Sequence, residues 1–121
     1  MADDFNNSIQ RTITMVRGDT LSFGFQITGL AGVEPDEIYF SCKDKLEDNE
    51  YIFSIDTSSG IELRSYDAET DTLTYGVALA PSYTKNVDLG RYFYDLRMTI
   101  DSDVITLMRG DFVLEWRVKS L

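Results

Sequence analysis

Apolar and polar side chains alternate along most of this chain, and a period of two strongly limits the folds that it can form. In residues 20–27, Leu21, Phe23, Phe25 and Ile27 share one face, while polar or small residues share the other. Successive side chains of a β-strand point to opposite faces of a sheet, so this pattern predicts a half-buried strand. The same alternation recurs in residues 37–43, 51–56, 72–79, 91–100 and 112–118.

Segments rich in turn-forming residues separate these runs at regular intervals. They lie at residues 28–37, 45–50, 57–60, 66–71 and 101–103. Short strands with turns at this spacing are typical of a β-sandwich or a small barrel. Residues 80–88, with Pro81 near their start, are the one helical candidate, and we expect a single short helical turn there between two late strands.

The length and composition favour one domain with its own core. We expect residues 1–121 to form that domain, with a flexible N-terminal arm at residues 1–8. The single cysteine, Cys42, excludes an intrachain disulfide. The first residues lack the basic start and apolar stretch of a signal peptide, and no apolar run approaches ~18 residues, so we expect neither a leader nor a membrane span.

The formal net charge of −10 is concentrated in the middle of the chain. Residues 34–71 hold 12 acidic and 3 basic side chains. Such a surface would repel a phosphate backbone or an anionic bilayer, which disfavours binding to nucleic acid or to membranes. The simplest interpretation is a charged face that is solvated by water.

The tripeptide Arg-Gly-Asp occurs twice, at residues 17–19 and 109–111. In an exposed loop this motif can bind an integrin, but both copies lie within strand-like runs, which disfavours integrin binding. Glycine followed by aspartate and flanked by strand residues indicates a turn or a β-bulge. We therefore interpret Gly18, Asp19 and Gly110 as structural turn residues.

The inward-facing residues change parity near the end of the chain. Ile105 and Leu107 are odd-numbered. The downstream inward set is even-numbered and comprises Phe112, Leu114, Trp116 and Val118. Side chains alternate strictly along a strand, so the change requires one inserted residue. We place this bulge at Gly110, where the strand would bend as it crosses between two sheets, and we expect Gly18 to bend the first strand in the same way.

Residues 88–95 match a more specific pattern. Asp88, Gly90 and Tyr92 fill the positions of the tyrosine corner that precedes the sixth strand of immunoglobulin domains. The Tyr92 hydroxyl should hydrogen-bond to the backbone just upstream. Tyr94 stands where those domains have a cysteine, so aromatic packing must replace their inter-sheet disulfide. The predicted fold class is all-β, an immunoglobulin-like antiparallel β-sandwich of about seven or eight strands.

Residues that carry out chemistry are sparse. The chain has no histidine, which removes histidine-based triads and most zinc sites, and Cys42 lies on an inward face as a small core residue. Acidic runs at residues 44–50, 67–71 and 101–103 contain oxygen ligands that calcium can use, but none has the spacing of an EF-hand loop. We therefore expect no enzyme, no catalytic residue, no cofactor and no metal site.

Several aromatic residues fall on outward faces or near turns. Tyr39 and Phe93 occupy outward strand positions, and Tyr51, Tyr66 and Tyr83 lie near turns. Together they form a candidate surface for contact with a protein or a sugar. The alternative is that each ring covers a strand edge or one end of the core, because isolated exposed aromatics are common.

The order of these motifs resembles a family of phage virion proteins, represented by the immunoglobulin-like N-terminal domain of baseplate upper proteins. The family pattern has a basic residue before Gly-Asp-Thr near the start, Gly-x-Tyr-x-Tyr-Asp late in the chain, and a hairpin that ends in Gly-x-Phe-x-Val. The matching residues are Gly18, Asp19, Thr20, Gly90, Tyr92, Tyr94, Asp95, Gly110 and Phe112, and the resemblance covers residues 13–119. Larger members continue into a receptor-binding or trimerising part that residues 1–121 do not include.

The resemblance implies a non-enzymatic structural protein of a tailed bacteriophage or prophage particle, as a baseplate, tail, neck or capsid-decorating component. It implies other virion proteins as partners, a homo-oligomer, and a location in the virion after assembly in the host cytoplasm. The residues alone leave a second hypothesis open. In that hypothesis the chain binds host-surface glycan or protein through its exposed aromatics, assisted by calcium in the acidic loops.

Overall fold

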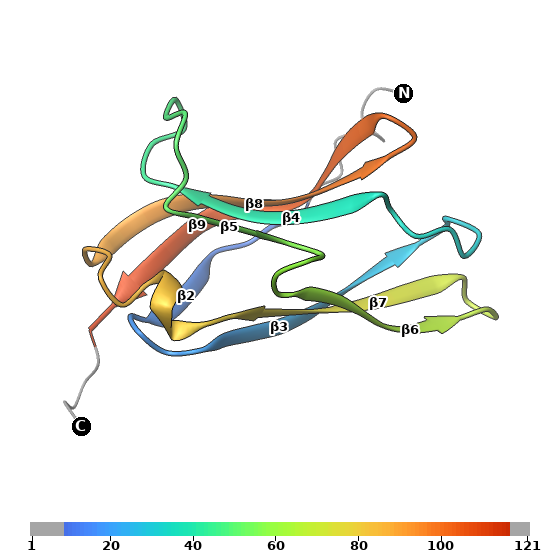
Figure 1. Ribbon diagram of the computed structural model, residues 1–121, viewed down its shortest axis with the longest axis horizontal. Helices are drawn as coiled ribbons and strands as arrows, with labels where there is room; N and C mark the ends of the chain where they lie inside the picture. The colour runs from blue at the N-terminus through green and yellow to red at the C-terminus, as the bar shows by residue number, and fades with distance from the viewer. Residues whose placement is uncertain (1–8, 117–121) are drawn as a thin grey trace.

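The computed structural model describes residues 9–116, which fold into two β-sheets packed face to face (Figure 1). The strands are β1 (Ile9–Gln10), β2 (Ile13–Val16), β3 (Leu21–Thr28), β4 (Glu37–Lys43), β5 (Phe53–Asp56), β6 (Ile61–Asp67), β7 (Thr72–Leu79), β8 (Gly90–Ile100) and β9 (Asp103–Glu115). A 3-10 turn, η2 (Pro81–Tyr83), joins β7 to β8. The all-β sandwich and its one short helical turn are thus confirmed. No helix of the described residues has the length and apolar character to span a bilayer.

The two layers differ in width. The larger sheet has the strand order β1-β9-β8-β4-β5, with β2 also paired to β9, and the smaller sheet has the order β3-β7-β6. The chain changes layer after β2, β3, β5 and β7, which is the arrangement of an immunoglobulin-like sandwich. β1 and β2 are two parts of one interrupted edge strand, so the sandwich has eight strand positions, in line with the expected number.

One edge of the larger sheet departs from the antiparallel expectation. β1 and β2 run parallel to β9, with Ile9 beside Met108 and Ile13 beside Phe112. A parallel pair needs a long connection between its strands, and here nearly the whole domain separates them. As a consequence, the first strand of the described chain completes the larger sheet and leaves the smaller sheet with three strands.

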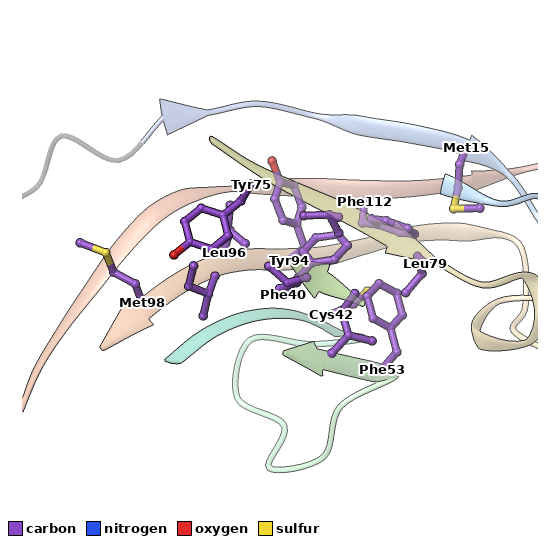
Figure 2. Close-up of a cluster of buried hydrophobic side chains, with 14 of the residues drawn as sticks. Met15, Phe40, Cys42, Phe53, Tyr75, Leu79, Tyr94, Leu96, Met98 and Phe112 are labelled. Carbon is purple, nitrogen blue, oxygen red and sulfur yellow. The ribbon is translucent and has the colours of Figure 1, made fainter. Parts of the chain in front are cut away.

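Aromatic rings from both layers meet at the centre of the sandwich, as Figure 2 shows. Phe40 of β4 is fully buried, and the centre of its ring lies 5.4 Å from that of Phe53 and 5.7 Å from that of Tyr94. Phe23 reaches the same ring from the smaller sheet at 5.5 Å. The rings meet edge to face, the geometry that aromatic pairs prefer. This packing occupies the centre of the core, where the free thiol of Cys42 is also buried.

The expected inward position of Trp116 is wrong. Phe112 and Leu114 are buried as expected, but Trp116 is 73% exposed. β9 ends at Glu115, so the alternation that places its side chains inward does not continue to the next residue. The Trp116 ring instead lies on the surface with the Arg17 guanidinium 5.8 Å from its centre. Val118 and the expected arm at residues 1–8 lie outside the described residues.

Candidate functional site

The tyrosine corner forms as the sequence pattern indicates. Tyr92 of β8 is buried, and its hydroxyl donates a hydrogen bond of 2.6 Å to the carbonyl oxygen of Asp88. Burial, together with the nearby negative charge of Asp88, raises the pKa of Tyr92, so the hydroxyl keeps the proton that it donates. Gly90 begins β8 with a φ of 147°, which a residue with a side chain rarely adopts. Asp88, Gly90 and Tyr92 therefore shape the entry to β8.

The first Arg-Gly-Asp copy lies in a turn and not within a strand, which corrects the expectation. Gly18 adopts a φ of 83° between β2 in the larger sheet and β3 in the smaller sheet, so the chain changes layer at this glycine. The amide of Gly18 donates to the Thr84 hydroxyl at 3.0 Å, and the amide of Asp19 donates to the Val16 carbonyl at 3.1 Å. The Arg17 guanidinium donates to a backbone carbonyl at 3.1 Å. These contacts hold the tripeptide against the fold.

The second Arg-Gly-Asp copy lies inside β9, and the bulge expected at Gly110 lies elsewhere. Gly110 pairs regularly with Tyr94, whereas the register shifts where Leu96 pairs with Met108 and the next residue of β8 pairs with Thr106. The inserted residue is therefore Leu107. The parity change was a correct inference, but its position was wrong, and β9 stays in the larger sheet along its whole length.

Gly110 has a different structural role. A Cβ at this position would overlap the backbone of Arg11, which joins β1 to β2. Beside it, the hydroxyl of Tyr94 donates to the Arg11 carbonyl at 2.6 Å, and the Arg11 amide donates to the Arg109 carbonyl at 3.0 Å. Burial raises the pKa of Tyr94 to about 12, and the positive charge of Arg11 partly offsets this rise. The missing side chain of Gly110 thus lets the first strand lie against the last.

The five candidate surface aromatics do not form one surface. Tyr39 and Phe93 lie on the outward face of the larger sheet, and Tyr51 lies close to Phe93 in the loop between β4 and β5. Tyr66 belongs to β6 in the smaller sheet, where its hydroxyl donates to Asp71 at 3.1 Å. Tyr83 lies in η2, with its ring centre 6.2 Å from that of buried Phe53, so it covers one end of the core.

Around Phe93 and Tyr51 the outward face of the larger sheet has a shallow hollow of about 170 Å³. Lys43 lies over the Tyr51 ring with its ammonium 5.2 Å from the ring centre. Arg97 also lines the hollow. It pairs with Asp95 at 3.3 Å, and its guanidinium lies 5.8 Å from the centre of the Tyr39 ring. Burial raises the pKa of Asp95, and the charges of Arg97 and Lys43 oppose that rise. The hollow is smaller than the ~300–1,000 Å³ of most small-molecule sites.

The acidic loops use their carboxylates on the protein itself. Asp71 accepts from the amides of Ala31 and Gly32 at 2.9 Å and 3.0 Å, and so joins the β6–β7 turn to the β3–β4 loop. Asp36 accepts from the amide of Asp101 at 3.1 Å. Within residues 9–116, no group of three or more histidine, cysteine or acidic side chains is placed to hold a metal ion.

A second hollow, larger than the one beside Phe93, was not foreseen from the sequence. It is a groove of about 1340 Å³ along one side of the sandwich, between β3 of the smaller sheet and β1, β2 and β9 of the larger sheet. Figure 1 shows the β8–β9 hairpin extending away from β3 and β7 at this end. The apolar side chains that line the groove include Ile9, Ile13, Leu21, Phe23, Phe25, Ile105, Leu107 and Met108.

β3 forms one wall of this groove and is an unusual edge strand. Within residues 9–116 its only strand neighbour is β7, so its other side is open. The pairing with β7 is continuous from Leu21 to Thr28, without a bulge, and β3 contains neither proline nor a charged residue. Exposed edges of this kind pair readily with other strands, and proteins usually blunt them.

The other three sheet edges of the described chain are blunted. β5 has four residues, and β1 and β2 have two and four residues on either side of an interruption. β6 has a bulge between Leu63 and Ser65 and carries Glu62, Arg64 and Asp67. The contrast singles out β3. A sequence signal for it was available, because residues 20–33 contain no charged side chain in a chain where 26% of residues are charged.

Comparisons with known proteins identify no family: no family model matches the chain, and no curated protein matches it.

Proposed function

We propose that this chain is a non-enzymatic structural protein that acts by assembly, as a component of a tailed bacteriophage or prophage particle. Its partners would be other virion proteins, and copies of the chain would be arranged as a homo-oligomer on the particle. The sequence motifs that resemble phage baseplate domains support a location in a phage particle, and the open side of the sandwich supports assembly as the mode of action. The position in the particle, whether baseplate, tail, neck or capsid surface, follows from the copy number.

The observation that carries this proposal is the open side of the sandwich. An eight-residue, uncharged edge strand lies beside a groove of about 1340 Å³ lined largely by apolar side chains. Leaving such a surface in water costs free energy in proportion to its apolar area, at roughly 25 cal/mol per Å². A protein that acts alone gains nothing from this arrangement, whereas a protein that is built into a larger assembly buries it against a neighbour.

The test is quantitative mass spectrometry of purified particles. A copy number in the hundreds would place the chain on the capsid or along the tail, and about a dozen copies would place it in the neck or baseplate, since closed symmetric rings set the count. An abundant host protein measured in the same preparation corrects for carry-over. Absence of the chain above that background contradicts the proposal.

The second candidate is a module that binds host-surface glycan or protein, and one observation favours it. Phe93, Tyr51 and Lys43 surround the shallow hollow on the outward face of the larger sheet, and aromatic rings beside a cation can hold a sugar or a peptide side chain. A glycan-binding screen with the wild type and with Phe93→Ala tests it. Binding that is lost in the variant would favour the module, as would a rise in melting temperature on addition of calcium. A negative result in both leaves assembly alone.

A further inference from the structure

We propose that the groove holds an extended strand donated by a neighbouring protein subunit, which pairs with the open edge of β3. This inference rests on the proposed assembly function and names the kind of partner that the open side accepts. The donated strand is uncharged along its centre and has apolar residues at every second position.

The backbone of β3 is prepared for this pairing. The amide of Gly29 donates to the carbonyl of Asp71 at 3.2 Å, directly after the last residue of β3. Hydrogen-bonded pairs alternate along an antiparallel ladder, so the odd-numbered residues of β3 exchange hydrogen bonds with β7. The N–H and C=O groups of Ser22, Gly24 and Gln26 therefore point to the open edge, where a donated strand can bind them.

The side chains of the groove define the partner's sequence pattern. Leu21, Phe23 and Phe25 are half-buried and point between the layers, toward Ile9 and Leu107 on the opposite wall. A residue directly opposite them on an added antiparallel strand points the same way. Alternate residues of the donated strand would therefore enter the groove, and apolar side chains there remove water from both walls.

The size and position of the groove favour a single strand over other occupants. Its volume exceeds the ~300–1,000 Å³ of ordinary small-molecule pockets. Five residues of β3 line it, between Leu21 and Gln26, and this span corresponds to roughly 20 Å of strand at ~3.4 Å per residue.

Charge also limits the partner. The groove contains one cation, Arg11, and one anion, Asp103, with an apolar stretch between them. Arg11 lies at the junction of β1 and β2, and Asp103 begins β9, so the two charges lie apart along the groove. A strand with a carboxylate that reaches Arg11 and a basic residue that reaches Asp103 would fit in one direction only.

The test uses the purified full-length chain and a synthetic probe peptide of alternating valine and threonine, about nine residues long, with a glutamate at one end and a lysine at the other. A peptide of the same composition with its valines clustered is the control probe. Binding is measured by fluorescence anisotropy, and amide exchange by nuclear magnetic resonance. We expect the alternating probe to bind and to slow exchange at Ser22, Gly24 and Gln26. The amides of Phe23 and Phe25 should be slow to exchange even without the probe, since they bond to β7.

Two pairs of variants locate the site. Gly24→Pro removes one edge donor without touching the ladder to β7, and we expect it to weaken binding by about tenfold, while Gly24→Ala stays within about twofold. Ile9→Asp places a charge in the groove at a side chain that is 55% exposed and therefore does not hold the fold together. Val33→Asp is its matched control, equally exposed at 55% but outside the groove. Ile9→Asp should weaken binding and Val33→Asp should not.

Four outcomes overturn the inference. Three of them are no binding of the alternating probe, equal binding of the clustered probe, and protection confined to amides outside β3. A fourth is a concentration-dependent dimer that Gly24→Pro abolishes, which would make the edge a self-association site. The particle measurement is independent of this test. Absence from particles rejects the phage role, whereas failure of the probe with the chain present in particles rejects only the donated strand.

Discussion

Gly110 of β9 packs directly against the backbone of Arg11, so closely that a Cβ at position 110 would overlap the Arg11 carbonyl oxygen. That oxygen also accepts the hydrogen bond from Tyr94, at 2.6 Å. The glycine of the second Arg-Gly-Asp tripeptide thus holds the beginning of the described chain to its last strand. The motif has a structural reason here that is independent of any receptor.

Gly110→Ala should destabilise the protein by about 1–3 kcal/mol, the usual cost of forcing an extra group into a packed contact. The new methyl group must push β1 and β2 away from β9. Urea unfolding followed by circular dichroism measures the change. Arg109→Ala is the control, since it also destroys the tripeptide but alters an exposed side chain, and it should stay within about 0.5 kcal/mol of wild type. Equal stability of both variants would contradict the packing role of Gly110.

Tyr92→Phe should cost about 0.5–1.5 kcal/mol, the net contribution of one hydrogen bond, because the Asp88 carbonyl loses its partner while the ring remains packed. The same urea experiment measures it. Tyr51→Phe removes a hydroxyl from a ring that is 46% exposed, and we expect almost no effect from it. If the two variants behave alike, the corner hydrogen bond does not stabilise the fold.

Asp71 should make stability depend on pH in the acidic range. Its amide donors, Ala31 first and then Gly32, together with the Tyr66 hydroxyl, lower the pKa of Asp71 below its ordinary value of 3.8. A lowered folded-state pKa adds stability that is fully present above the ordinary value and disappears as the pH falls through the folded-state value. The difference in unfolding free energy between wild type and Asp71→Asn should therefore be constant near neutral pH and shrink below about pH 4.

Tyr66→Phe removes one of these donors and leaves the two amides. The difference in unfolding free energy between wild type and Tyr66→Phe should therefore shrink over the same pH range, and it should be smaller than the difference for Asp71→Asn. Urea titrations from about pH 2 to 7 cover the window in which aspartate titrates. A difference between wild type and Asp71→Asn that does not change with pH would show that the carboxylate charge is not linked to folding.

Cys42 should resist thiol reagents in the folded protein. Burial, and secondarily the negative charge of Asp44, raise the pKa of the thiol to about 12, so almost no thiolate exists at neutral pH. We expect reaction with Ellman's reagent to follow unfolding, with full reaction only in denaturant. The Gly110→Ala variant should react faster than wild type, by the factor by which its unfolding equilibrium constant is larger. Fast labelling of the folded wild type would place the thiol nearer to the surface than its 1% exposure indicates.

Periodicity predicted the core strands well because each was decided by its own residues. β4 and β7 bury the alternating positions that the sequence assigned inward. β8 buries them except for the half-buried Ile100, and β3 buries Ile27 fully and its other inward positions in part. The parity change in β9 was also visible, but not its position. A bulge at any residue between the odd-numbered and the even-numbered inward positions would produce the same change. Gly110 looked suited to a bulge, but its missing side chain is needed for contact with Arg11.

The candidate surface was the least predictable part. Outward alternation assigned Tyr39 and Phe93 to one face, and they do lie on the outward side of the larger sheet. Tyr66 and Tyr83 were grouped with them only because they lie near turns, and turns that are distant in space look alike in sequence. Trp116 was assigned inward because the alternation was extended to it, but β9 ends one residue earlier and the side chain is exposed.

The sequence by itself determined an all-β sandwich, a tyrosine corner and a core closed by aromatic rings, because these depend on local alternation and on turn residues at short spacing. The tertiary structure alone decided which sheet the first strand joins. β1 and β2 bind β9 from the far end of the chain, so β3 keeps an open edge beside an apolar groove. That choice depends on hydrogen bonds and packing between segments about a hundred residues apart, and no local pattern records such energies.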